Sequence, residues 1–181
     1  RELQFYDCGF RAFPSVVLEL PALERLNLSC NLLFELGPEI GQLTQLRFLD
    51  LGSCMLEALP GEITLLENLQ ELSLDGIETL EELPEDFGRL KKLRYLSLAE
   101  TPLESLPASF AQLTLLEYLD LTSTALASNH VHDDHDDPDD EREDGGLGRG
   151  IVALLAGFTS ESPVARAEAL QQLIDEHRSV L

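Results

Sequence analysis

Three histidines lie among a run of aspartates in the last third of the chain, and these are side chains that can bind a divalent metal. His130, His132 and His135 sit beside nine Asp and Glu in residues 133–144. Imidazole and carboxylate groups bind such an ion when regular structure fixes their geometry. Residues 129–150 show no apolar periodicity that would supply a helix or strand. We therefore interpret this segment as a solvated acidic linker, and predict no metal site and no cofactor.

Other groups that could do chemistry do not assemble into a catalytic set. The four glycines that follow the acidic run have no strand before them and no Lys-Ser/Thr after them, so they do not form a phosphate-binding loop. The fourth histidine, His177, stands far along the chain, without a candidate nucleophile and orienting group in a recognisable pattern. The sequence therefore predicts a protein that is not an enzyme.

The charge of the chain limits the kinds of partner it can have. Its formal net charge is −22, and no apolar run approaches the ~20 residues of a membrane span. A negative field repels phosphate backbones and anionic lipid. We predict another protein with a basic surface as the partner, and neither nucleic acid nor membrane. The chain opens on Arg1 without a signal peptide, so we expect it to be a fragment or a processed product. Its three cysteines include no closely spaced pair, so we expect a cytoplasmic protein.

The elements that would position any binding residue come from a leucine repeat. Leu23, Leu46, Leu69, Leu93 and Leu116 begin successive repeats, at spacings of 23, 23, 24 and 23 residues. A second leucine follows three residues later in each repeat, and a third follows two residues after that. Leu3 and Phe5 supply the same pair for a truncated repeat at the start. Such self-similarity is the signature of a stacked repeat architecture.

The segments LERLNLSCNLLFELGPEIGQLTQ and LRFLDLGSCMLEALPGEITLLEN resemble the intracellular leucine-rich repeats of 23 residues. Repeats of this type occur in Ras-group scaffolds, plant intracellular proteins and bacterial effectors. The resemblance covers about residues 1–128. It implies an α/β solenoid with a curved parallel sheet on the concave side and short helices or 3-10 turns on the convex side. It does not by itself imply one function, because the same solenoid supports many binding tasks.

The physical pattern supports the same architecture. Alternation in Leu26-Asn27-Leu28 predicts a short strand whose leucines share one face, and strands one repeat apart stack in parallel. Prolines such as Pro60 begin the return path with φ restricted. One repeat cannot enclose its own leucines, so several must stack. The repeat from Leu69 has one extra residue in the segment 75–80, which we interpret as a bulge after the strand or as neutral drift in a loop.

The ninth position of each repeat is usually Asn in this family, where its side chain satisfies backbone groups of the turn. Here it is Cys8, Asn31, Cys54, Ile77, Thr101 and Thr124. We predict buried, inert thiols at Cys8 and Cys54. Cys30 lies one position earlier, where side chains begin to face the opening, and is predicted to be the most reactive thiol.

Residues between the inward leucines face outward from the sheet, and we call this surface the concave face. Aromatic residues and acids recur on it, which predicts a protein-binding surface because Tyr and Arg are favoured where binding energy concentrates. The alternative interpretation is a cross-strand ladder that only stabilises the sheet. The largest contributions are predicted from Phe48, Asp50, Tyr95, Tyr118 and Asp120. The predicted site comprises Tyr6, Asp7, Arg25, Asn27, Phe48, Asp50, Glu71, Asp75, Tyr95, Glu100, Tyr118 and Asp120.

The sequence predicts three segments: repeats in 1–128, the acidic linker in 129–150 and a helical segment in 151–181. Ser162-Pro163 has the form of a helix start, and an apolar stripe follows it. That stripe either caps the last repeat or docks on another chain. The predicted function is a protein–protein interaction module. The alternative is the substrate-recognition part of a larger enzyme, such as a ubiquitin ligase or a GTPase regulator.

Overall fold

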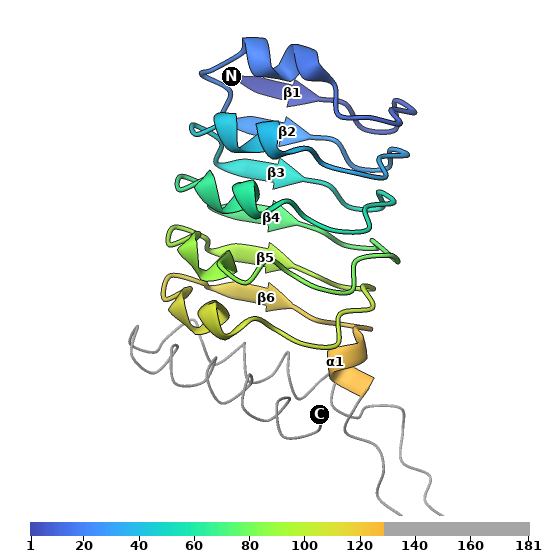
Figure 1. Ribbon diagram of the computed structural model, residues 1–181, viewed down its shortest axis with the longest axis vertical. Coiled ribbons are helices and arrows are strands. Elements are labelled where there is room, and N and C mark those ends of the chain that lie inside the picture. The colour runs from blue at the N-terminus through green and yellow to red at the C-terminus, as the bar shows by residue number, and fades with distance from the viewer. Residues whose placement is uncertain (129–181) are drawn as a thin grey trace, which may run out of the picture.

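The computed structural model describes residues 1–128. The acidic linker and the C-terminal segment predicted from the sequence lie outside the described residues. Residues 1–128 form a stack of six coils, each consisting of one strand, a turn and a return path (Figure 1). Within these residues no helix has both the length and the apolar composition needed to cross a bilayer.

The six strands form one parallel sheet in chain order, each paired with the next. The predicted strand centres pair in exact repeat register, for example Leu49 with Leu72 and Leu72 with Leu96. This confirms the prediction of six parallel strands. The strands are β1 (Glu2–Gln4), β2 (Arg25–Asn27), β3 (Phe48–Asp50), β4 (Glu71–Ser73), β5 (Tyr95–Ser97) and β6 (Tyr118–Asp120).

Short 3-10 helices form the return path of the first five coils. Most of them begin after a proline in extended conformation, such as Pro60 at φ −67°, and each ends with a bond from a leucine N–H to the carbonyl three residues earlier. Such tight turns suit a return path of only a few residues. The helices are η1 (Ser15–Glu19), η2 (Pro38–Gln42), η3 (Gly61–Leu65), η4 (Phe87–Arg89) and η5 (Ala108–Gln112), and the α-helical turn α1 (Ala125–Ser128) follows β6.

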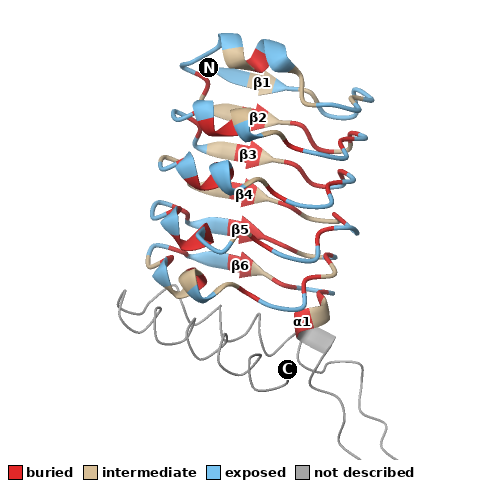
Figure 2. Ribbon diagram, viewed as in Figure 1, coloured by how far each residue is buried: buried red, intermediate tan, exposed pale blue. Residues whose placement is uncertain are grey.

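The core is a column of leucines between the sheet and the 3-10 helices. Buried segments recur at the same place in successive coils (Figure 2). Two return paths contribute Phe87 and Phe110 in place of an aliphatic residue, and their rings stack with centroids 6.1 Å apart. Each coil therefore covers the leucines of its neighbour, as a stacked solenoid requires.

The turn after each strand has a residue in the left-handed region at the same position of the repeat, and five of these six residues are not glycine. The conformation costs a side-chain-bearing residue about 1–2 kcal/mol. Here the N–H groups of these turns bond to the next coil, for example Cys30 N to the Gly52 carbonyl at 2.8 Å. The six residues are Asp7, Cys30, Ser53, Gly76, Glu100 and Ser123.

The extra residue of the fourth repeat is accommodated as an additional turn after β4. Leu80 N–H donates to the Ile77 carbonyl at 3.1 Å and closes this turn. The Thr79 hydroxyl donates to the Leu56 carbonyl of the preceding coil at 2.7 Å. Ile77 itself is fully buried, so at this ninth position an apolar contact replaces the hydrogen bonds of asparagine.

The three thiols differ in exposure, and one prediction is wrong. Cys8 is exposed in the first of the described coils, and its thiol donates to the Tyr6 carbonyl, with Sγ 3.5 Å from the oxygen. Cys54 is buried as predicted, and burial raises the pKa of its thiol. Cys30 is half-buried, and a hydrogen bond with its thiol is the main cause that raises the pKa of Tyr6.

Candidate functional site

Positions are counted from the first leucine of each repeat, such as Leu23. The side chains at the third position form a continuous row across the concave face. The Arg25 guanidinium carbon lies 4.1 Å from the centroid of the Phe48 ring. Further along, the Tyr95 and Tyr118 rings stack at 4.5 Å and 1° between their planes. Glu71 pairs in register with both Phe48 and Tyr95 and so stands between the two stacks. The predicted ladder of Phe48, Tyr95 and Tyr118 is therefore present only between the two tyrosines, which remain 38% and 45% exposed.

Five residues on β5, β6 and the turn after β4 form what we call the Tyr–Asp cluster: Asp75, Tyr95, Ser97, Tyr118 and Asp120. Ser97 is its floor, 2% exposed, and its hydroxyl donates to Asp75 Oδ1. The Tyr118 hydroxyl donates to Asp120 Oδ2 at 3.2 Å. The cluster thus combines two flat rings with two carboxylates held by hydroxyl groups.

The electrostatics of the Tyr–Asp cluster reflect burial and its two carboxylates. Burial, and next the charge of Asp120, raise the pKa of Tyr118 to about 12. Burial also raises the pKa of Tyr95, assisted by the charges of Asp75 and Asp120. Burial acts to raise the pKa of Asp120, but hydrogen bonds from Thr122 and Tyr118 outweigh it, so the net shift lowers the pKa. At neutral pH the cluster therefore holds two neutral phenols beside an anionic Asp120.

These pKa values predict an alkaline titration. Tyr118 is expected to ionise near pH 12 rather than at its ordinary value of 10. Because the folded protein holds this proton more tightly than the unfolded chain, the raised pKa adds to the free energy of unfolding. This contribution is complete below pH 10 and is lost as pH rises through 12. Solvent at the half-exposed ring limits it to about 1 kcal/mol or less. Asp120→Asn should lower the pKa of Tyr118 but leave it above 10, because burial remains.

Tyrosinate absorbance measures this titration, and Tyr118→Phe identifies its last phase. Circular dichroism at each pH controls for alkaline unfolding. A Tyr118 pKa that does not change in Asp120→Asn would contradict this account of the site.

Several side chains at the fifth position of the repeat accept hydrogen bonds from the backbone of the turn after their own strand. Asn27 Oδ1 accepts from the Ser29 N–H at 2.9 Å, and Asp50 Oδ1 accepts from the Gly52 N–H at 3.0 Å. Asp120 Oδ1 does the same with the Thr122 N–H at 2.9 Å. This is the Asx-turn bond that such side chains make with the backbone two residues on. Asn27 and Asp50 therefore have a structural role in addition to the predicted binding role.

The structure brings together only part of the predicted site. Tyr6 and Asp7 lie in the first coil, beside Cys30 rather than beside the other aromatics. Glu100 lies in the turn after β5, where it lines a pocket of about 260 Å³ with Glu78 and Pro102.

Ser73 and Ser97 are paired on the concave face, but the site predicted from the sequence does not include them. Ser73 Oγ donates to Asp75 Oδ2 at 3.1 Å, and Ser97 holds the other oxygen. Their register could have identified them, because both occupy the same position of the repeat as Asp120.

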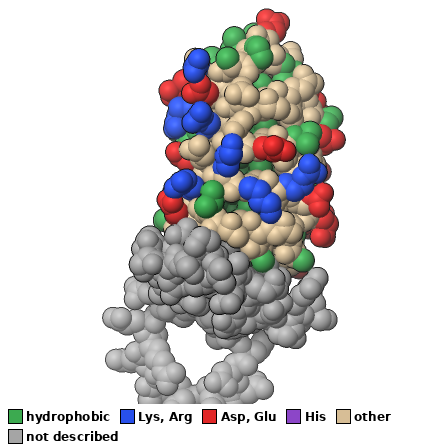
Figure 3. Space-filling view, turned by 90° about the vertical axis from the view of Figure 1, so that its left-hand side faces the viewer, with side chains coloured by type: hydrophobic (Ala, Val, Ile, Leu, Met, Phe, Trp, Pro, Cys, Tyr) green, Lys and Arg blue, Asp and Glu red, His purple; other side chains and the backbone are tan. Residues whose placement is uncertain are grey.

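The basic residues gather on one edge of the solenoid. Figure 3 faces the side on which the strands begin, where blue side chains alternate with red ones. Lys91 and Lys92 lie in the loop before β5, and their Nζ atoms donate to the neutral amides of Gln112 and Asn68, each at 2.7 Å. The charged strand residues of the concave face, by contrast, are acidic except for Arg25: Glu2, Asp50, Glu71 and Asp120. Basic and acidic residues therefore concentrate on different sides of the coil, which the net charge alone does not show.

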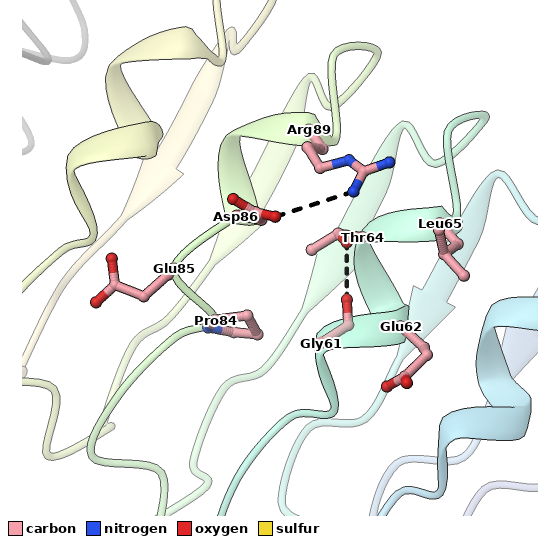
Figure 4. Close-up of a pocket in the computed structure, with 8 residues that line it drawn as sticks. All are labelled: Gly61, Glu62, Thr64, Leu65, Pro84, Glu85, Asp86 and Arg89. Carbon is pink, nitrogen blue, oxygen red and sulfur yellow. Dashed lines mark hydrogen bonds and ion pairs between the residues drawn. The ribbon is translucent and has the colours of Figure 1, made fainter.

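A shallow pocket of about 450 Å³ lies on the convex side between η3 and η4 (Figure 4). Its one cation, Arg89, is 3.9 Å from Asp86. Its one hydroxyl, on Thr64, donates to the Gly61 carbonyl at 2.7 Å. These polar groups are already paired within the pocket, and no nucleophile lines it beside a base. The convex pocket therefore offers less for recognition than the Tyr–Asp cluster.

The chain is similar to short segments of two known proteins. It is 45% identical over 83 residues to the TMV resistance protein N of Nicotiana glutinosa and 40% identical over 80 residues to the adenylate cyclase of Schizosaccharomyces pombe. These matches cover 45% and 42% of this chain, but only 7% and 5% of those proteins.

Two solved structures share the fold. The leucine-rich repeat domain of the type III effector XopL superposes with a TM-score of 0.65 at 31% identity, over 70% of this chain and 45% of that one. A leucine-rich repeat protein of Leptospira interrogans gives 0.52 at 35% identity, over 64% and 35%.

A family model also matches most of the chain. Residues 1–133 match the model described as leucine-rich repeat region. Such regions generally mediate contacts between proteins and are generally not catalytic. The six parallel strands, the leucine register and this match agree, and the chain therefore belongs to the leucine-rich repeat family.

Proposed function

We propose that this chain is a non-catalytic protein-binding module of the cytoplasm that binds a partner protein on its concave face. The partner presents a basic surface, and neither nucleic acid nor membrane is bound. The observation that supports this most is the stack of Tyr95 and Tyr118. Both rings stay more than a third exposed on a face where no core remains to be filled. Exposed aromatic residues of this kind supply much of the binding energy in protein interfaces.

The test compares two pairs of apolar side chains of similar exposure. Tyr95→Ala/Tyr118→Ala should weaken partner binding at least about thirty-fold, because the loss of even one hot-spot aromatic costs roughly 2 kcal/mol. Phe34→Ala/Met55→Ala is the control, since these side chains are 45% and 42% exposed in the turns after β2 and β3. The partner is captured from lysate with the wild-type chain, and its affinity for each variant is then measured by calorimetry. An unchanged affinity of the tyrosine variant, with a loss in the control, would place the site elsewhere.

One observation favours a second candidate, the substrate-recognition part of a larger enzyme such as a ubiquitin ligase or a GTPase regulator. The repeats matched here make up only 5% of an adenylate cyclase and 7% of a resistance protein. In that case the concave face would bind the substrate protein, and another domain would catalyse the reaction. The full-length transcript distinguishes the two candidates by showing whether a catalytic domain accompanies the repeats.

A further inference from the structure

The Tyr–Asp cluster contains two carboxylates on either side of one buried hydroxyl. Ser97 pairs in register with Asp120 on β6, and its hydroxyl bonds to Asp75 from the other direction. Adjacent parallel strands lie about 4.8 Å apart. Both carboxylates therefore lie near Ser97, which is itself almost inaccessible to solvent, and the charges of both act on Tyr95.

No cation of the described residues neutralises this pair. The ion pairs within residues 1–128 are Arg1 with Glu24, Asp86 with Arg89, and Arg94 with Glu117. Each carboxylate oxygen of Asp75 accepts one hydroxyl, and a carboxylate has about four acceptor sites in all. The hydroxyl groups thus fix the carboxylate and leave it able to accept more donors. A bound cation that carries several N–H groups would therefore stabilise the carboxylates of the cluster.

The rings decide which cation fits best. Tyr95 and Tyr118 stack parallel, so each ring covers one face of the other and the outer faces of the stacked pair are left for a planar group. A guanidinium is planar, stacks on aromatic rings and donates in a fork to carboxylates, whereas an ammonium is a compact point charge. The chain already shows this contact at the same position of the repeat, where the Arg25 guanidinium lies over Phe48. The concave face can therefore hold a guanidinium against a third-position ring.

We propose that the Tyr–Asp cluster is an arginine subsite, in which Asp75 and Asp120 accept the N–H groups of a partner's arginine whose guanidinium lies against Tyr95 and Tyr118. This assignment rests on the proposed function and names the chemistry of the partner. It predicts that the bound segment of the partner contains arginine where other basic surfaces have lysine.

The test uses N-acetylarginine amide as the probe, with its lysine and citrulline analogues, on the full chain. Binding is followed by NMR through the ring signals of Tyr95 and Tyr118. We expect saturable shifts with arginine amide and binding at least about ten-fold weaker for citrulline amide, which has the shape without the charge. Equal binding of citrulline or lysine amide would overturn the proposal.

Variants and salt provide the second readout. Asp75→Asn and Asp120→Asn should each weaken arginine binding about ten-fold. Glu62→Gln, at an exposed acid of η3 on the convex side, is the control and should leave it unchanged. Added salt should weaken binding to the wild type, which requires no variant to fold. Binding that resists both the Asn variants and salt would overturn the proposal.

Partner affinity separates this proposal from the proposed function. A partner that depends on Tyr95 and Tyr118 while arginine amide fails to bind would overturn the subsite and leave the binding face in place. Arginine amide that binds as expected supports the subsite, even if the tyrosine variant shows that the captured partner docks on another face.

Discussion

Replacing Gly88 by alanine is expected to destabilise the solenoid by about 3 kcal/mol, at the upper end of the range for overpacking. A Cβ at this position would lie 1.9 Å from the Ser109 carbonyl oxygen and 2.6 Å from its carbon, both in the backbone of the next coil. The coils are held this close because Gly88 N–H donates to Ser109 Oγ at 2.9 Å. A backbone atom cannot move aside as a flexible side chain can, so η4 and η5 would have to separate.

Gly61→Ala is the matched control for this substitution. Gly61 also lies in a 3-10 helix of the return path, and a Cβ there would meet nothing within 4 Å. We expect its free energy of unfolding to stay within about 0.5 kcal/mol of the wild type, or to rise slightly because alanine restricts the unfolded chain. Urea unfolding followed by circular dichroism measures both variants. Similar stability of the two would mean that the coils are not in contact at Gly88.

Replacing Asn31 by alanine is expected to cost roughly 3–5 kcal/mol. Asn31 is 1% exposed, and its Oδ1 accepts from the N–H groups of Cys8 and Phe10 at 3.1 and 3.0 Å. Its Nδ2 donates to the carbonyls of Phe5, Leu28 and Ser29 at 2.7, 2.7 and 3.2 Å. Each buried polar group left without a partner costs about 1–3 kcal/mol. One side chain therefore joins the first two coils.

Thr101→Val provides the comparison at the same position of another repeat. The Thr101 hydroxyl makes one bond, to the Leu98 carbonyl at 2.7 Å, so its loss should cost only about 1 kcal/mol. Hydrogen exchange adds a spatial test, because each coil contacts only its neighbours. In Asn31→Ala the amides of β1 and β2 should lose protection while those of β5 and β6 keep it. Uniform loss of protection along the solenoid would contradict this role for Asn31.

The fold could be predicted from the sequence because the repeat period is a local property. Leu26 and Leu28 alternate within a strand, and their equivalents return every 23 or 24 residues, which requires parallel strands in register. The same register correctly placed Phe48, Tyr95 and Tyr118 in one row. Stacking converts sequence period directly into spatial neighbourhood, so few other arrangements bury the leucines.

The sequence could not reveal which members of the row join into a site. Asp75 lies in the turn of one coil and Ser97 in the strand of the next, and only the path of the turn after β4 brings their side chains together. Register likewise placed Cys8 and Cys54 at one equivalent position, but the first is exposed and the second buried. Exposure depends on whether a neighbouring coil covers the position, and this is decided by where a repeat lies in the stack.

The sequence by itself thus determined the solenoid, its strand register and the row of aromatic and acidic side chains on the concave face. Only the tertiary structure decided that Tyr95 and Tyr118 stack, that Asp75 and Asp120 lie on either side of Ser97, and that Asn27 and Asp50 hold their own turns. The physical reason is that the inward leucines repeat at short range in the chain. Hydrogen bonds and ring contacts between outward side chains instead depend on rotamers and turn geometry, which the repeat period does not specify.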